Sequence, residues 1–178
     1  MKSLESYLTT YARYHRDRRN IATHFVGIPM IVVGVTALLS RPQIAAGSVT
    51  LSPAVAVTLG AILFYVLLDR RFGAVMALLL AGSLGAGHWF GAQSLGTWLG
   101  GSLGLFFVGW VIQFIGHYFE GKKPAFVDDL VGLLVGPLFV VAEVAFALGL
   151  RAELEQSITA EAGPLRSQRP SKLTESRS

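Results

Sequence analysis

The chain contains no cysteine, and this absence excludes disulfides, thiolate metal sites and cysteine nucleophiles. A bound metal must therefore use imidazole, carboxylate or water ligands, a set that suits iron, zinc or manganese. Charged residues are also scarce, at 15% of the 178 residues. The first twenty residues lack the apolar segment of a signal peptide, so we expect no cleavable signal.

Hydrophobic residues, in contrast, make up 52% of the chain, and the mean hydropathy is +0.54. These values exceed those of an ordinary soluble domain, and the excess is concentrated in several long runs. We predict an all-α fold, a polytopic membrane helix bundle of about five spans with an N-terminal amphipathic interfacial helix. The predicted parts are the interfacial helix and charged turn (1–20), the transmembrane bundle (21–150) and a polar, disordered tail (151–178).

The apolar runs place the five spans at 21–39, 53–68, 72–90, 97–119 and 130–150. Gly96, Gly100 and Gly104 form a small-xxx-small pattern that favours close helix packing. Alternation of the spans gathers most basic residues of the loops at one membrane face: Arg13, Arg16, Arg18, Arg19, Arg70, Arg71, Lys122 and Lys123. The positive-inside rule makes this face cytoplasmic, in an inner or plasma membrane if the source is bacterial.

The basic tail would lie on the opposite side, which indicates that one segment is re-entrant or that the last segment does not fully span. No basic cluster is interleaved with aromatic residues in a nucleic-acid-binding pattern, so nucleic acid is not an expected partner. The expected partners are instead membrane lipids and, as an open alternative, a second copy of the chain.

Two clusters of polar residues border the apolar runs. His117 and Glu120 end the fourth run at i and i+3, a spacing that puts both side chains on one helix face. His15 and His24 flank the start of the first run, and the charged turn between them lets their side chains converge. The topology brings the three histidines to one membrane face, with Glu120 beside them as the candidate catalytic carboxylate. Three imidazoles leave room for substrate and dioxygen on non-haem iron, or for water on zinc.

The other polar residues each allow a structural and a functional interpretation. Asn20 is either the N-cap of the first span or a donor that orients a ligand histidine. Gln113, one turn before His117, either orients that imidazole or bonds a neighbouring helix. His88 is a further candidate metal ligand, although alternation places it toward the opposite face. Glu143 in an apolar helix is either protonated or paired with a basic group. Three further carboxylates fit turns and helix starts: Asp69, Asp128 and Asp129.

The two clusters resemble those of a known family. The resemblance rests on two blocks: Tyr14-His15, Asn20, His24 and Gly27-Ile28-Pro29, then Gln113-Phe114, Gly116-His117, Phe119-Glu120-Gly121 and Pro124-Ala125 with the later Pro137. In these blocks the chain is similar to the Mpo1-like membrane family of 2-hydroxy fatty acid dioxygenases, over about 7–150. The resemblance implies a 2-hydroxy fatty acid substrate, Fe(II) as cofactor, dioxygen as co-substrate and a product one carbon shorter. It implies His15, His24 and His117 as ligands, and it associates His88 with a further family histidine.

Two other classes of function stay open at this point. A haem or quinone protein would use His24 and His117 as axial ligands from two helices. A non-enzymatic transporter or scaffold would line a polar path with its histidines and Glu143. Each histidine alone also has an ordinary interpretation, a hydrogen bond to a neighbouring helix or a place at the headgroup level.

Overall fold

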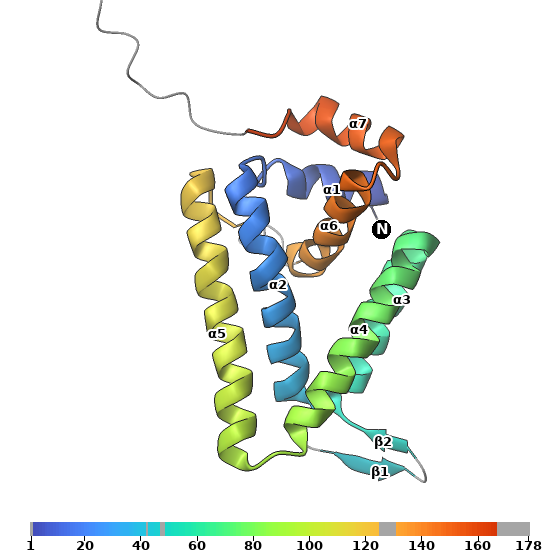
Figure 1. The fold of residues 1–178 in the computed structure, drawn as a ribbon. Helices are drawn as coiled ribbons and strands as arrows, with labels where there is room; N and C mark the ends of the chain where they lie inside the picture. Colours follow the sequence, from blue (N-terminus) through green and yellow to red (C-terminus); the bar gives the residue numbers. More distant parts are fainter. Residues whose placement is uncertain (1, 42, 47–48, 125–130, 167–178) are drawn as a thin grey trace, which may run out of the picture.

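The computed structural model describes residues 2–41, 43–46, 49–124 and 131–166 (Figure 1). Helices dominate these ranges, and a two-stranded antiparallel hairpin links two of them. In chain order the elements are α1 (Leu4–Ala12), α2 (Arg18–Leu39), β1 (Ile44–Ala46), β2 (Val49–Leu51), α3 (Pro53–Leu68), α4 (Arg70–Gly91), α5 (Leu95–Glu120), α6 (Gly132–Ala147) and α7 (Ala152–Ala162). The predicted all-α class is confirmed.

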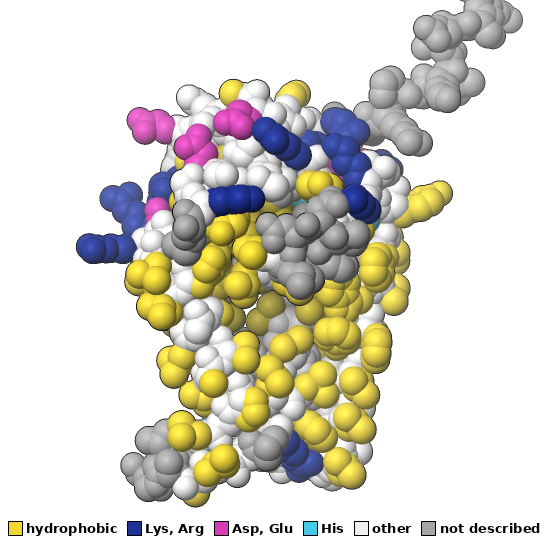
Figure 2. Space-filling view, turned by 180° about the vertical axis from the view of Figure 1, so that it is seen from behind, with side chains coloured by type: hydrophobic (Ala, Val, Ile, Leu, Met, Phe, Trp, Pro, Cys, Tyr) yellow, Lys and Arg dark blue, Asp and Glu magenta, His cyan; other side chains and the backbone are white. Residues whose placement is uncertain are grey.

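Helices lie at all five predicted positions, but they differ in length. Among the described residues, α2, α4 and α5 are long and apolar enough to cross a membrane. If α6 and α7, which are bent by 116° at a short break, are counted as one span, the number of such segments rises to four. Helix α3 is apolar but has only 16 residues. Figure 2 shows the corresponding surface, with hydrophobic side chains over most of the length and charged side chains gathered mainly at the end that carries α1 and α7. This distribution is that of a membrane protein.

Capping groups set several of these boundaries. Asp69 accepts hydrogen bonds from the backbone N–H groups of Arg71 and Phe72, each at 2.9 Å, so α4 begins two residues earlier than predicted. The hydroxyl of Ser94 caps α5 by accepting from the N–H of Thr97. These caps satisfy amide groups that would otherwise lack a partner at a helix start.

Glycines seven residues apart bring α2 and α5 together. A Cβ on Gly27 would lie 2.8 Å from the carbonyl oxygen of Gly109, and a Cβ on Gly34 would lie 2.9 Å from that of Ser102. Seven residues are nearly two helical turns, so each pair lies on one face of its helix. The predicted packing stripe at 96, 100 and 104 is wrong, because a Cβ at any of these glycines meets no described atom within 4 Å.

The C-terminal part of the described chain folds back over α1 (Figure 1). Arg13 on the turn after α1 pairs with Glu161 of α7 at 3.2 Å, and Ile158 of α7 is buried in the apolar core. The segment thus returns to the end of the bundle where α5 stops, which agrees with both alternatives, a re-entrant segment or a last segment that does not fully span. Residues 152–162 of the expected disordered tail form a helix, since Leu154 and Ile158 supply an apolar face for α1. Asp128 and Asp129 lie outside the described residues.

Candidate metal centre

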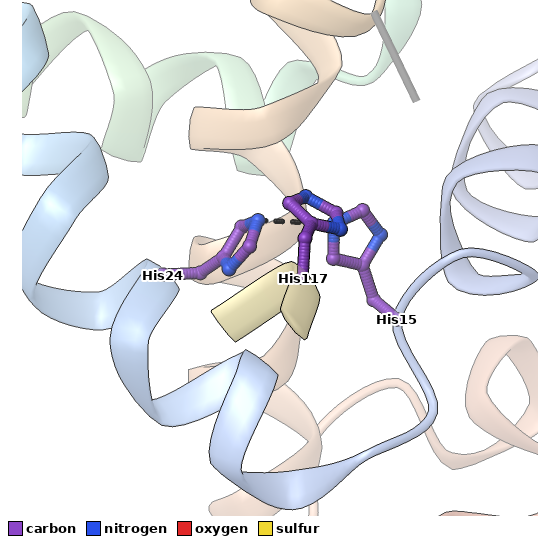
Figure 3. A group of neighbouring side chains, drawn as sticks. All are labelled: His15, His24 and His117. Atoms are coloured by element: carbon purple, nitrogen blue, oxygen red, sulfur yellow. Dashed lines mark hydrogen bonds between the residues drawn. The ribbon is translucent and has the colours of Figure 1, made fainter. Parts of the chain in front are cut away.

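Three histidines from distant parts of the chain meet at this end of the bundle (Figure 3). His15 lies on the turn between α1 and α2, His24 nearly two turns into α2, and His117 in the last turn of α5. All three are buried, and one ring nitrogen of each lies within 4.8 Å of those of the other two. The ring centroids are 4.5 Å apart for His15 and His24, 5.0 Å for His15 and His117, and 5.2 Å for His24 and His117.

The hydrogen bonds of two of these rings determine which nitrogens face the centre. The Nδ1 of His15 lies 2.7 Å from the carbonyl oxygen of Tyr11, and the Nδ1 of His24 lies 2.8 Å from that of Asn20. A carbonyl oxygen only accepts, so each Nδ1 carries the hydrogen. The Nε2 of each neutral ring then presents a lone pair, and the two Nε2 atoms lie 2.9 Å apart.

Two lone pairs at this distance repel each other unless a proton or a metal cation lies between them. Burial, together with the nearby His24 ring, holds the pKa of His15 well below its ordinary value, so protonation is disfavoured. A metal-bound histidine usually donates its other ring N–H to a carbonyl or carboxylate, as both rings do here. The donor set therefore fits a divalent metal ion held by neutral imidazoles.

Glu120 is directed away from this centre. Its Oε2 accepts hydrogen bonds from the backbone N–H groups of Arg16 at 3.0 Å and Asp17 at 2.7 Å, and its Oε1 pairs with the Arg166 guanidinium. Within the described ranges, the cluster with metal-binding geometry contains the three histidines and not this carboxylate. The turn that carries His15 uses Oε2 and Arg166 uses Oε1, so Glu120 lies outside the three-histidine cluster. Its catalytic role stays a prediction.

Asn20 connects the carboxylate to the metal centre. It lies inside α2 and is not the N-cap, a role taken by Asp17, whose side chain accepts from the N–H of Arg19 at 2.9 Å. The Asn20 side chain donates to Oε2 of Glu120 at 3.2 Å, while its backbone carbonyl holds His24. Asn20 therefore orients a ligand candidate through its backbone rather than through its amide.

The structure separates His88 from the other histidines. Asp69 at the start of α4 pairs with Arg151 near α7, at 3.0 Å, whereas His88 lies in the last turn of α4, near the hairpin (Figure 1). An unbroken helix of 22 residues is about 33 Å long, which places these two residues at opposite ends of the bundle. His88 as a ligand is thus contradicted, since α4 is neither short nor broken. Asp69 and Glu143 take no part in the histidine cluster either.

Gln113 and the histidines border a cavity between α2, α5 and α6. The cavity has a volume of about 70 Å³, and its lining is mostly apolar: Tyr11, His24, Ile28, Ile31, Val32, Trp110, Gln113, His117, Pro124, Gly132, Leu133, Gly136 and Pro137. A larger cavity of about 220 Å³ between α2, α4 and α6 shares Ile28, Val32 and Pro137 with it. The two cavities therefore adjoin the same apolar side chains of α2 and α6.

Sequence reasoning missed two residues that shape the centre. The ring of Tyr11 stacks on His15 with a centroid distance of 4.1 Å and an interplanar angle of 4°. The available signal was its position four residues before His15, where side chains share a helix face. Arg16, expected only as a topology signal, is buried and donates from Nε to the carbonyl oxygens of Ala12 and His15.

A haem between two histidines does not fit this arrangement. Axial ligands lie on opposite sides of a porphyrin, which must occupy the space between them. Here the ring of His15 lies beside both other rings and fills part of that space.

Fold and site together define a helical membrane protein with a buried three-histidine centre suited to a divalent metal ion. The chain belongs to the Mpo1-like family, whose profile, described as 2-hydroxy-palmitic acid dioxygenase Mpo1-like, matches residues 1–148. It is 33% identical over 174 residues to the 2-hydroxy-palmitic acid dioxygenase MPO1 of Saccharomyces cerevisiae, an alignment that covers 93% of this chain and 95% of the yeast protein. No solved structure matches the chain.

Proposed function

We propose that this protein is a membrane-embedded, non-haem Fe(II)-dependent dioxygenase that shortens 2-hydroxy fatty acids by one carbon. The observation that carries the proposal is the pair of imidazole lone pairs, on His15 and His24, that face each other at 2.9 Å beside His117. The name of the yeast relative, a 2-hydroxy-palmitic acid dioxygenase, supports the same reaction class.

The reaction needs no reductant besides its substrate. In the balanced equation, RCH(OH)COOH and O2 give RCOOH, CO2 and H2O, with cleavage of the bond between C1 and C2. Oxidation of these two carbons supplies all the electrons that reduce dioxygen, so 2-oxoglutarate is not required. When bound, Fe(II) would supply a Lewis acid for the carboxylate and hydroxyl of the substrate and a centre that activates dioxygen.

The protein supplies the ligands, the apolar surroundings and a place for the alkyl chain. His15, His24 and His117 hold the metal, and the carbonyl groups of Tyr11 and Asn20 keep two of these rings in the ligating tautomer. The substrate head occupies the cavity beside the histidines, and the alkyl chain continues into the larger cavity, whose walls are almost wholly apolar. Relative to water, burial of the chain there is favourable by about 0.8 kcal/mol for each CH2 group.

We also propose that the centre faces the cytoplasm. Basic residues cluster at the end of the bundle that carries it: Arg13 pairs with Glu161 of α7, Lys122 donates to the carbonyl oxygen of Arg13, and Arg18 begins α2. Short segments rich in Lys and Arg remain on the cytoplasmic side of a membrane. The same charges attract the carboxylate of a fatty acid to this end.

Elemental analysis of the full-length protein, purified in detergent, tests the metal. We expect stoichiometric iron in the natural protein and loss of iron in His24→Ala and His117→Ala. His88→Ala is the matched control, because this histidine lies outside the cluster, and it should retain iron. Conversion of 2-hydroxypalmitic acid to pentadecanoic acid, with uptake of dioxygen, should follow the iron content across the four proteins.

Three results would contradict the proposal. Turnover that persists after complete removal of iron would exclude an iron enzyme. Stoichiometric zinc without uptake of dioxygen would indicate another metal and another reaction. Protein without any stoichiometric metal would favour the transporter or scaffold.

A further inference from the structure

Gln113 is a buried polar residue without a partner in the described structure. Only 4% of its surface is exposed, and its Nε2 makes no hydrogen bond with any described residue. The side chain lines the cavity beside the histidines, one turn before His117. The structure therefore lacks the bond between Gln113 and the His117 ring that the sequence suggested.

An unpaired amide of this kind is costly and needs an explanation. Buried polar side chains in folded proteins almost always have a hydrogen-bond partner. A short hydroxyl such as Ser102 on the same helix can turn toward a carbonyl of its own helix, but a glutamine amide is too far from its backbone to do so readily. The amide of Gln113 thus has unused hydrogen-bonding capacity next to the candidate metal centre.

The packing of α2 makes room for this amide. A Cβ on Gly27 would lie 2.8 Å from Nε2 of Gln113 and 3.3 Å from its Cδ. The absence of a side chain at residue 27 therefore permits the amide to lie between α2 and α5. His117 Nδ1, one turn along α5, is the other partnerless buried atom on the cavity wall within the described chain.

We propose that Gln113 is a substrate-binding residue whose amide N–H donates a hydrogen bond to an oxygen of the 2-hydroxy acid head. This inference rests on the proposed function, because it uses the same cavity and the same class of substrate. The donor has no partner among the described residues, so the substrate oxygen completes its hydrogen bonding. The carboxylate is an ionised acceptor, for which such a bond is strongest.

The proposal predicts opposite effects on stability and on binding. Gln113→Met removes the amide with little change in shape, so the fold should be as stable as before or more stable. Affinity for 2-hydroxypalmitate should fall roughly 10- to 100-fold, the usual consequence of losing a hydrogen bond to a charged group. Gln113→Glu keeps the length but places a second carboxylate against the substrate, so binding should be weaker still.

The experiment compares both variants with the natural protein and with Ser102→Ala. The control removes another partnerless buried atom from α5, at a residue outside both cavities. Iron content and thermal denaturation report on the fold and the metal centre. The dissociation constant for 2-hydroxypalmitate, followed by tryptophan fluorescence of the metal-free protein, reports on binding without turnover, and KM and kcat of the iron-loaded protein follow. We expect Gln113→Met to keep its iron, its stability and most of its kcat, with a raised KM and dissociation constant.

Unchanged affinity in Gln113→Met would overturn the proposal, and so would a Gln113→Met protein that is less stable or fails to fold, because the amide would then bond within the protein. Failure of the proposed function gives a different result. A natural protein without iron or turnover that still binds 2-hydroxypalmitate would refute the enzyme, while the dissociation constants would still decide the role of Gln113. A natural protein that does not bind 2-hydroxypalmitate would overturn both.

Discussion

Glu120→Gln tests whether this carboxylate holds the His15 turn or takes part in chemistry. The carboxylate accepts three hydrogen bonds at Oε2, from two backbone N–H groups of the turn and from Asn20. Glutamine keeps one oxygen at this place but loses the charge. A hydrogen bond to a charged group contributes roughly 1.5–3 kcal/mol and one between neutral groups about 0.5–1.5 kcal/mol. Each of the two backbone bonds should therefore weaken by about 1 kcal/mol.

With the bond from Asn20 weakened as well, the total expected loss in the free energy of unfolding is about 2–3 kcal/mol, a large part of the roughly 5–15 kcal/mol of a typical domain. Arg166 adds little to this sum, because its side chain is 54% exposed. The same change loosens the turn that carries His15, so metal affinity should fall by about 10- to 100-fold, as it does when a group that orients a ligand is removed.

Thermal denaturation in detergent measures the loss of stability, and metal titration measures the loss of metal affinity. Glu161→Gln is a suitable control, since Glu161 and its partner Arg13 are both 56% exposed and the pair should contribute less than about 1 kcal/mol. A Glu120→Gln protein with natural stability and a full complement of metal, yet no turnover, would refute the reasoning. That result would assign the carboxylate to the reaction.

Two further predictions concern packing and pH. Gly116→Ala should destabilise the protein by about 1–3 kcal/mol, because the new methyl group collides with Thr23 and lies 2.5 Å from Oδ1 of Asn20. Gly104→Ala is the control, since the space around this residue is open, and it should leave the free energy of unfolding unchanged in the same denaturation assay. Burial alone would raise the pKa of Asp69, but the Arg151 guanidinium and two backbone N–H groups outweigh it, so the pKa is lowered. A lowered folded-state pKa stabilises the protein above the unfolded value of 3.8 and ceases to do so as pH falls through the folded value. Asp69→Asn should therefore melt below the natural protein at pH 7 and approach it below pH of about 4, and an unchanged gap would contradict the role of the ion pair.

The geometry of the site required tertiary information at several places. Glu120 and His117 share a helix face in the sequence pattern, yet the carboxylate bonds the backbone of a turn 103 and 104 residues earlier, while the imidazole faces the centre. The chain offers no local signal for that choice, because the energy of the bond depends on which donors packing brings near. The partnerless amide of Gln113 and the bend between α6 and α7 depend on packing in the same way.

The sequence alone determined the class of fold, the positions of the apolar helices, the absence of thiolate chemistry and the gathering of three histidines at one end of the bundle. Hydropathy and helical periodicity depend on residues that are neighbours in the chain, so both can be calculated from the sequence without coordinates. Only the tertiary structure decided which helix faces meet, why His88 is excluded and which imidazole nitrogens point at one another. Those features follow from the packing of helices distant in the chain, where a shift of a few ångströms changes which atoms can bond.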